Sequence, residues 1–200
     1  MRRVGTCSLL LLSLATVSLA AKPKKAAKAT SAPASKQAAA APVAKVDHLA
    51  PIAAQFESGK DLSASQVAGL VGTVEGLSLD CGTGCLSSFA ASKVQNRTSR
   101  YLAVQLRQDQ TAADRKRSAV WLVTFGESGK RLDAKLIEGR ESADGRHSGV
   151  RTTFVAPDRF EVRSWSSFEP VKQDPTLSEA TPERFKISED GHIVEEAAGK

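Results

Sequence analysis

Two cysteines lie close together in the sequence Asp-Cys-Gly-Thr-Gly-Cys, at Cys81 and Cys85. The intervening Gly82 and Gly84 take positive φ angles easily, which helps bring residues four apart within bridging distance. Closing so short a ring stabilises a fold by only about 2 kcal/mol, so its main effect is to fix the local turn. The spacing predicts a disulfide between Cys81 and Cys85.

The same cysteines also fit a Cu(I) or redox site, because thiolates are soft ligands that select this ion. Candidate third ligands are the histidines of the chain, His48, His147 and His192. However, the flanking segments lack the strand–helix context of a thioredoxin-like site, and the single methionine is Met1. A structural disulfide is therefore the preferred interpretation, and copper or redox chemistry is the alternative.

No catalytic signature stands out elsewhere in the chain. There is no Gly-x-Ser-x-Gly elbow, His-Glu-x-x-His pattern, phosphate-binding loop or dinucleotide fingerprint. Adjacent carboxylates occur at Glu189 and Asp190 and at Glu195 and Glu196, in an expected turn and near the C-terminus, where solvated charge is the ordinary explanation. We predict no catalytic residues, no metal site and no cofactor.

Residues 1–20 have the pattern of a cleavable secretory signal peptide. Two arginines precede an apolar run, and small residues at Ser18 and Ala20 predict cleavage before Ala21. The apolar run is shorter than the ~20 residues that span a bilayer as a helix. Cys7 would leave with the signal, so the mature chain keeps an even number of cysteines. The expected location is the periplasm or the secreted medium.

Residues 21–47 are built mainly from alanine, lysine, proline and serine. Such a segment buries too little apolar surface to offset the entropy of ordering it, so we predict a disordered tail. Its lysines are Lys22, Lys24, Lys25, Lys28, Lys36 and Lys45. They offer at most peripheral electrostatic contact with an anionic membrane or cell wall, and the other interpretation is a solvated spacer.

The formal charge of the whole chain is +6, with an isoelectric point near 9.4. That excess belongs to the N-terminal region, because residues 48–200 hold 20 basic and 21 acidic residues. Aromatic residues, which stack on bases, make up only 5% of the chain. We therefore expect no nucleic-acid partner.

Residues 48–200 are expected to form a single α+β domain, with a helical part at 48–95. Between Asp61 and Leu77, apolar residues recur at spacings of three and four, which indicates one amphipathic helix. Asp61 or Ser63 is its expected cap, and Gly76 its expected end. A second, short helix is predicted over residues 86–94.

The pattern changes to β hairpins at residues 100–196. Apolar and polar residues alternate from Tyr101 onward, and the run 119–125 is apolar on both faces, as in a central strand. Later expected strands are 131–139, 149–156, 159–166, 184–188 and 192–196. Expected loops are 108–118, 141–148 and 166–183. The prediction is an antiparallel meander forming an open sheet, a sandwich or a partial barrel, with Trp121 and Trp165 in its core.

These features point to an exported, non-enzymatic binding protein whose partner is an unknown protein or cell-envelope component. One alternative is a secreted enzyme inhibitor that presents the turn between Cys81 and Cys85 as a rigid loop. The others are a copper or redox protein that uses the same cysteines, and an envelope hydrolase whose site the sequence does not disclose.

Overall fold

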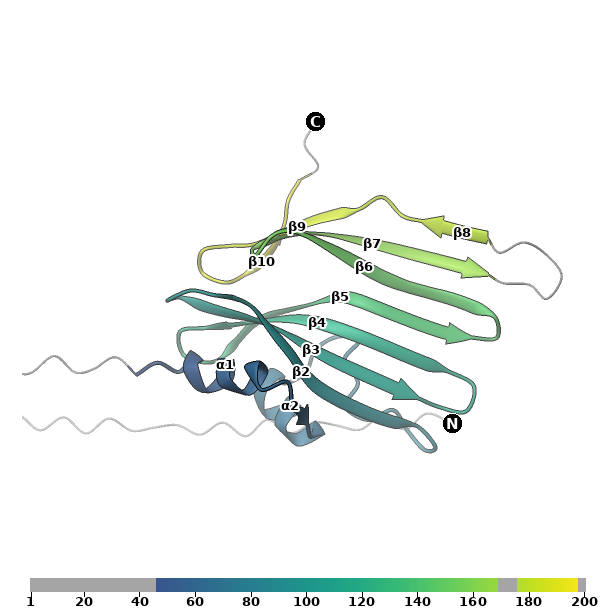
Figure 1. Cartoon of the computed structure of the whole chain (residues 1–200), viewed down its shortest axis with the longest axis horizontal. Helices are drawn as coiled ribbons and strands as arrows, with labels where there is room; N and C mark the ends of the chain where they lie inside the picture. Colours follow the sequence, from purple (N-terminus) through teal and green to yellow (C-terminus); the bar gives the residue numbers. More distant parts are fainter. Residues whose placement is uncertain (1–45, 169–175, 198–200) are drawn as a thin grey trace, which may run out of the picture. The chain divides into compact units, whose positions relative to one another are not determined.

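The computed structural model describes residues 46–168 and 176–197 (Figure 1). The predicted signal peptide and the predicted disordered tail up to residue 45 lie outside these residues. Two helices come first, α1 (Leu49–Glu57) and α2 (Ala64–Val71). The strands are β1 (Asp61–Leu62), β2 (Leu86–Arg97), β3 (Tyr101–Thr111), β4 (Lys116–Gly126), β5 (Arg131–Ala143), β6 (Arg146–Ala156), β7 (Arg159–Phe168), β8 (Thr176–Glu179), β9 (Glu183–Ile187) and β10 (Ile193–Glu195). Neither helix has the length and hydrophobicity needed to cross a bilayer.

The ten strands form one antiparallel sheet, in which nine follow the order β1-β2-β3-β4-β5-β6-β7-β9-β10 and β8 lies off this path. From β2 to β7 each strand pairs with the next one along the chain, so this part is a meander. Strands β8 and β9 both pair with β7, β9 along Arg159–Val162 and β8 along Trp165–Phe168. The predicted fold class, an N-terminal helical segment followed by an antiparallel open sheet, is confirmed.

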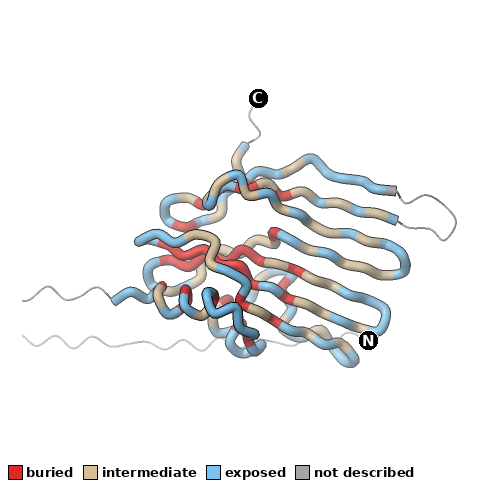
Figure 2. The backbone as a smooth tube through the Cα atoms, in the orientation of Figure 1, coloured by how far each residue is buried: buried red, intermediate tan, exposed pale blue. Residues whose placement is uncertain are grey.

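The helices and one face of the sheet enclose the larger hydrophobic core. In α1, Leu49, Ile52, Ala53 and Phe56 recur at helical spacing and are buried. The strand residues that face the helices alternate along β3 and β4; they are Leu102, Val104, Leu106, Trp121, Val123 and Phe125. Figure 2 shows buried residues gathered where the helices adjoin the sheet, whereas many strand ends are exposed. Helix α1 is not among the elements predicted from the sequence.

Helix α2 begins at one of its two predicted caps, Ser63. The Ser63 hydroxyl accepts a hydrogen bond from Gln66 N (3.2 Å), and Gln66 Oε1 accepts one from Ser63 N (2.8 Å). This reciprocal pair is a capping box, which satisfies amide groups that the first turn leaves unpaired. The helix is shorter than predicted because Gly72, with φ of 65°, ends it before Gly76.

The helix predicted over residues 86–94 is wrong, because this segment belongs to β2 and pairs with β3. Phe89 and Ala91 are buried two positions apart, which is the period of a strand with one covered face. The ladder with β3 pairs the residues of this segment with Leu106–Thr111 and Val104–Gln105. This long-range pairing outweighs the weak local preference for a helix.

Strands also occupy much of the predicted loops at 108–118, 141–148 and 166–183. Only Asp144 and Gly145 separate β5 from β6, and their φ angles of 50° and 71° fit a two-residue hairpin turn with positive φ at both positions. Polar residues in and beside these strand ends face solvent or form ion pairs with a neighbouring strand, as Arg115, just before β4, does with Glu141 of β5 (3.6 Å). Polarity alone therefore does not indicate a loop here.

A second, smaller core lies on the face of β3 and β4 that points away from the helices. Strands β5 and β6 pair with each other only where Gly139–Ala143 of β5 lies opposite Arg146–Val150 of β6. The part of β5 before Gly139 and the part of β6 after Val150 do not pair with each other. Side chains of β6, β7 and β9 then pack against the residues of β3, β4 and β5. The buried members of this core are Tyr101, Ala103, Leu122, Ile137, Phe160, Val162, Phe185 and Ile187.

The two tryptophans have different environments. Trp121 is in the first core with 4% of its surface exposed, as predicted. Trp165 belongs to neither core and is only partly buried, so its assignment to the core is wrong. It lies on β7 beyond the second core, where the flanking Ser164 and Ser166 are exposed. This places an aromatic side chain on the surface of the sheet.

Candidate binding site

Five strands contribute one row of residues to a single face of the sheet. The register places Ser118 opposite Arg140, Arg140 opposite Gly149, Gly149 opposite Trp165, and Trp165 opposite Glu179. Directly opposed residues of antiparallel strands point to the same side of a sheet. This row therefore crosses β4, β5, β6, β7 and β8 on one face.

A second row lies two residues along the strands from the first. In it Arg107 is opposite Val120, Val120 is opposite Glu138, and Arg151 is opposite Arg163. Val120 packs against the second core, so the members of both rows on β3, β4 and β5 lie on the face that points away from the helices. On β6 and β7 the rows alternate with Val150 and Val162 of the second core, so Arg151 and Trp165 point away from that core. We name this surface the open face; it comprises Arg107, Asp109, Lys116, Ser118, Val120, Glu138, Arg140, Ser142, His147, Gly149, Arg151, Arg163, Trp165, Ser167 and Glu179.

Positive charge exceeds negative charge on the open face. Its five cations are Arg107, Lys116, Arg140, Arg151 and Arg163, and its three anions are Asp109, Glu138 and Glu179. The resulting charge of +2 contrasts with the nearly neutral balance of residues 48–200. This surface therefore has a modest excess of positive charge, which would attract anionic partners.

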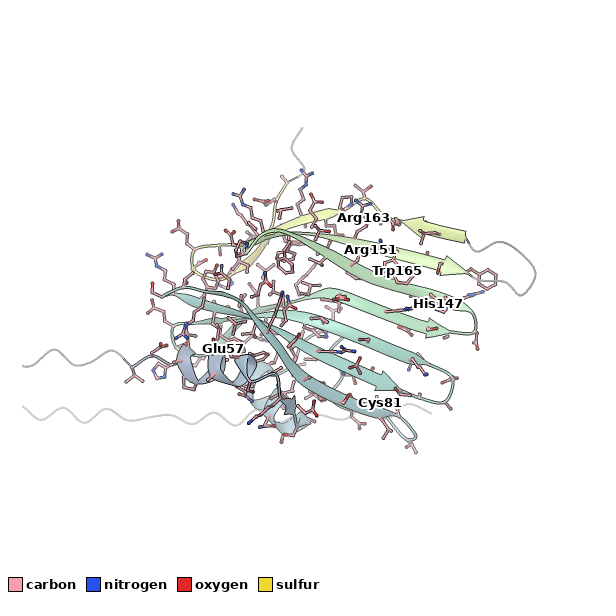
Figure 3. The ribbon with its side chains drawn as sticks, viewed as in Figure 1. Glu57, Cys81, His147, Arg151, Arg163 and Trp165 are labelled. Atoms are coloured by element: carbon pink, nitrogen blue, oxygen red, sulfur yellow. A yellow bond between two sulfur atoms is a disulfide. The ribbon has the colours of Figure 1, made fainter. Side chains whose placement is uncertain are left out.

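Trp165 lies on β7, between Gly149 of β6 and Glu179 of β8. A Cβ placed on Gly149 would come within 3.0 Å of Trp165 Cε2, so the indole lies close above the glycine. The Arg151 guanidinium lies 6.0 Å from the centroid of the indole ring, at the outer limit of a cation–π contact. Figure 3 shows Arg163, Arg151, Trp165 and His147 together along β6 and β7, apart from Glu57 and Cys81.

Glu179 forms ion pairs with two arginines of the second row, Arg151 and Arg163. Glu179 Oε1 lies 3.1 Å from Arg151 Nη2, and Glu179 Oε2 lies 3.2 Å from Arg163 Nη1, so the carboxylate forms an ion pair with each guanidinium. The Arg151 and Arg163 side chains remain 56% and 42% exposed. A guanidinium has five N–H donors, so both arginines keep donors for a ligand while Glu179 restrains their position.

Arg107 and Asp109 form a bidentate pair at the other end of the open face. Arg107 Nε donates to Asp109 Oδ2 (2.8 Å), and Arg107 Nη2 donates to Oδ1 (3.3 Å). Burial acts to raise the pKa of Asp109, but hydrogen bonds from Arg107 and Ser118 outweigh it, and the pKa lies below its usual range. The same pairing raises the pKa of Arg107. Both groups are therefore charged at neutral pH.

A recess of about 250 Å³ lies on the open face beside Trp165. A separate recess of about 360 Å³ lies at the start of α1. The lining of the recess beside Trp165 consists of Ser118, Val120, Glu138, Gly139, Arg140, Val150, Arg151 and Trp165. Apolar surface therefore adjoins two guanidinium groups, a carboxylate and a hydroxyl. Arg140 is exposed, and the structure gives it no carboxylate partner among the described residues.

Ser142 and His147 form the nearest approach to a nucleophile and base on this surface. The Ser142 hydroxyl lies 2.8 Å from His147 Nδ1, across the pairing of β5 with β6. A hydrogen-bonded serine and histidine are the first two members of a hydrolytic triad. They are also an ordinary cross-strand contact, and the described residues include no group of three His, Cys, Asp or Glu side chains fit to hold a metal ion.

The predicted disulfide is confirmed: Cys81 and Cys85 are bonded, with their Cα atoms 5.6 Å apart. Cys85 N donates to Gly82 O (3.3 Å), and Gly82 N donates to Asp80 Oδ1 (2.9 Å), so the loop is a tight turn before β2. Both sulfur atoms are used by the bond, and Cu(I) binding would first require their reduction. His147 is on β6, four strands along the sheet from β2, roughly 19 Å at the usual strand spacing.

The remaining predicted residues are dispersed. All six lysines of the predicted anionic-surface site, Lys22, Lys24, Lys25, Lys28, Lys36 and Lys45, lie outside the described residues. His48 precedes α1, and His192 Nδ1 lies 2.9 Å from Asp133 Oδ2 near β10. The structure brings neither histidine to the open face.

The open face is not predicted from the sequence. A signal was present in β7, where Arg163, Trp165 and Ser167 follow one another at the two-residue period of a single strand face. Because Trp165 is expected in the core, the sequence gives no indication that this face of β7 exposes an aromatic residue between two polar ones. The partners Arg140 and Arg151 come from other strands, and only the strand pairing brings them beside Trp165.

No protein-family model matches the chain, and no curated protein or solved structure matches it.

Proposed function

We propose that the protein is an exported, non-enzymatic binding protein of the cell envelope or the secreted medium, and that its open face is the binding surface. The observation that carries this proposal is the exposed arrangement of Trp165 among Arg140, Arg151 and Arg163. Tryptophan and arginine are the residue types that contribute most often to binding energy at interfaces.

Two independent features support export. The first twenty residues have the charged start, apolar run and small residues of a signal peptide. The folded region contains a disulfide, a bond that persists mainly in oxidising compartments such as the periplasm. Export would place the open face among envelope components, many of which are anionic.

A co-sedimentation assay with isolated envelope material tests the proposal. Binding by the wild-type chain is compared with binding by Trp165→Ala. The matched control is Phe168→Ala, because Phe168 is also on β7, is 43% exposed and has an arginine, Arg146, 5.7 Å from its ring. Phe168 is three positions after Trp165, an odd offset along the strand, so the two aromatic side chains point to opposite faces.

We expect Trp165→Ala to weaken envelope binding about tenfold or more, as for a residue central to an interface. Phe168→Ala should bind as the wild type does. Equal binding by all three chains would exclude the open face as the binding surface. Hydrolysis of an envelope substrate that Ser142→Ala abolishes would replace the proposal with the hydrolase alternative.

A second candidate function is inhibition of an enzyme by the disulfide loop. Residues Gly82, Thr83 and Gly84 are exposed within the cross-linked turn, and the adjacent Leu86 is 78% exposed. A constrained, exposed loop costs less entropy to order on binding than a flexible one. Loss of binding to an enzyme in Leu86→Ser, with no loss in Trp165→Ala, would favour this function over the first.

A further inference from the structure

We infer that the recess beside Trp165 binds an acidic sugar unit of a glycan, an inference that rests on the proposed function. The relevant groups are an aromatic ring, apolar side chains, guanidinium groups and acceptor oxygens, all within one recess of about 250 Å³. Each group restricts the chemistry of the ligand, and together they favour a sugar that carries a carboxylate or phosphate.

The size and lining of the recess suit one ring-sized group. Its volume falls below the ~300–1,000 Å³ of pockets that enclose drug-sized ligands. Val120 and Val150 provide apolar contact, and Trp165 provides an aromatic surface. The face of an aromatic ring carries partial negative charge, so it attracts the weakly positive C–H groups that line one side of a pyranose ring. A sugar ring can therefore pack here through its C–H face.

The guanidinium groups require an anion in the same ligand. Arg140 and Arg151 both line the recess, and Arg140 has no carboxylate partner among the described residues. A guanidinium binds a carboxylate or a phosphate through two parallel hydrogen bonds. The excess of positive charge over the open face acts in the same direction. A neutral sugar would leave the Arg140 guanidinium without its preferred acceptor.

The acceptor groups distinguish a sugar from a plain anion. Glu138 and Ser118 line the recess beside the arginines, and the Glu138 carboxylate can accept hydrogen bonds but cannot donate them when ionised. An oxyanion alone would leave this acceptor without a donor, whereas the hydroxyl groups of a sugar would donate hydrogen bonds to it. A ligand with an oxyanion, hydroxyl donors and a C–H face satisfies all of these groups at once.

The open face offers space for a chain of such units. The row from Ser118 to Glu179 crosses five strands, or roughly 19 Å at the ~4.8 Å spacing of neighbouring strands. Ser142 and Ser167 lie on the same face beside this row, and both have hydroxyl groups. The recess would hold one unit, while neighbouring units lie along the sheet.

Binding of defined oligomers to the purified chain tests this inference. The probes are an oligogalacturonate, which carries carboxylates, a phosphorylated oligosaccharide, a neutral maltooligosaccharide of equal length, and poly-glutamate. Calorimetric titration gives the affinities, and NMR follows the indole N–H of Trp165 separately from that of Trp121. The variants are Trp165→Ala and Arg140→Ala, with Phe168→Ala as the control.

We expect the carboxylated or the phosphorylated oligosaccharide to bind at least about tenfold more tightly than the neutral one, and the stronger arm identifies the oxyanion. Trp165→Ala and Arg140→Ala should each weaken that binding about tenfold, whereas Phe168→Ala should not. Arg140 is exposed, so its replacement leaves the fold intact even if Trp165→Ala destabilises it.

Equal binding of poly-glutamate, equal binding of the neutral sugar or absence of binding by every glycan would overturn the inference. In those cases the envelope assay separates two conclusions. Envelope binding that still depends on Trp165 would leave the proposed function standing with another ligand. Envelope binding that is indifferent to Trp165 would remove the proposed function as well.

Discussion

Gly149 and Trp165 are directly opposite each other on β6 and β7, and the indole lies close above the glycine. A Cβ at position 149 would come within 3.0 Å of Trp165 Cε2 and would also overlap the backbone carbonyl oxygen of Gly139 on β5. The glycine therefore allows both the position of the tryptophan and the close approach of β5 to β6. The open face depends on this single small residue.

Gly149→Ala should destabilise the fold by about 1–3 kcal/mol, the usual effect of overpacking, because a backbone atom must shift to admit the methyl group. Urea unfolding measures the change. Gly69→Ala is the matched control: Gly69 lies within α2, and a Cβ there would meet nothing within 4 Å. It should stabilise the fold by about 1 kcal/mol, since alanine favours a helix. Equal stability of the wild type and Gly149→Ala would show that the strands are not held this closely.

Replacing both Cys81 and Cys85 with serine should lower the stability by about 2 kcal/mol, because the closed loop is short. The fold should persist, since neither cysteine belongs to either core. Thiol titration of the unreduced, unfolded mature protein should find no reactive thiol, and the uncleaved precursor should show only Cys7. Two reactive thiols in the mature protein, together with stoichiometric Cu(I) binding, would support the copper alternative.

Local patterns predicted the elements whose own residues determine their conformation. The alternation that starts at Tyr101, the apolar run of β4 and the cap at Ser63 all correspond to elements of the structure. Helix α1 was missed because it has only nine residues, begins beside the expected tail and includes Pro51. A short helix of this kind depends on packing against β2 and β3 more than on its own propensity.

Long-range pairing explains the other misses. β2 contains few apolar residues and becomes a strand because β3 provides its hydrogen-bond partners. The open face has the same origin, since Arg140, Arg151 and Trp165 belong to three strands and meet only through their register. The separation of β5 from β6 beyond Gly139 has no sequence signal that we can identify, although it creates the second core.

Asp109→Asn should make the melting temperature less dependent on pH in the acidic range. Because the pKa of Asp109 is lowered in the fold, its contribution is present above the unfolded pKa of about 3.9 and is lost as the pH falls through the folded pKa. The wild type should therefore be more stable than the variant near pH 6, and the difference should disappear toward pH 2. Melting temperatures across this range measure it. A difference that stays constant with pH would contradict the assignment to this carboxylate.

Glu57→Gln should stabilise the protein by about 0.3–1 kcal/mol. Glu57 is the exposed last residue of α1, and the last turn has no basic residue, so its charge faces the negative end of the helix dipole. Asp47 provides the opposite case, because it accepts hydrogen bonds from Leu49 N (2.9 Å) and Ala50 N (3.1 Å) at the other end. Asp47→Asn should destabilise the helix. Chemical unfolding of the two variants should thus show changes of opposite sign.

Deleting residues 22–45 should weaken binding to anionic vesicles or envelope fragments and reduce its dependence on salt. The deletion removes all six lysines of the N-terminal region, and exposed charges are screened beyond about 8 Å at physiological ionic strength. The open face stays in place, so the remaining binding should still be sensitive to Trp165→Ala. Sedimentation at several salt concentrations, with and without the deletion, separates the two contributions. If the deletion changes neither the affinity nor its salt dependence, the lysines take no part and the arginines of the open face account for the attraction.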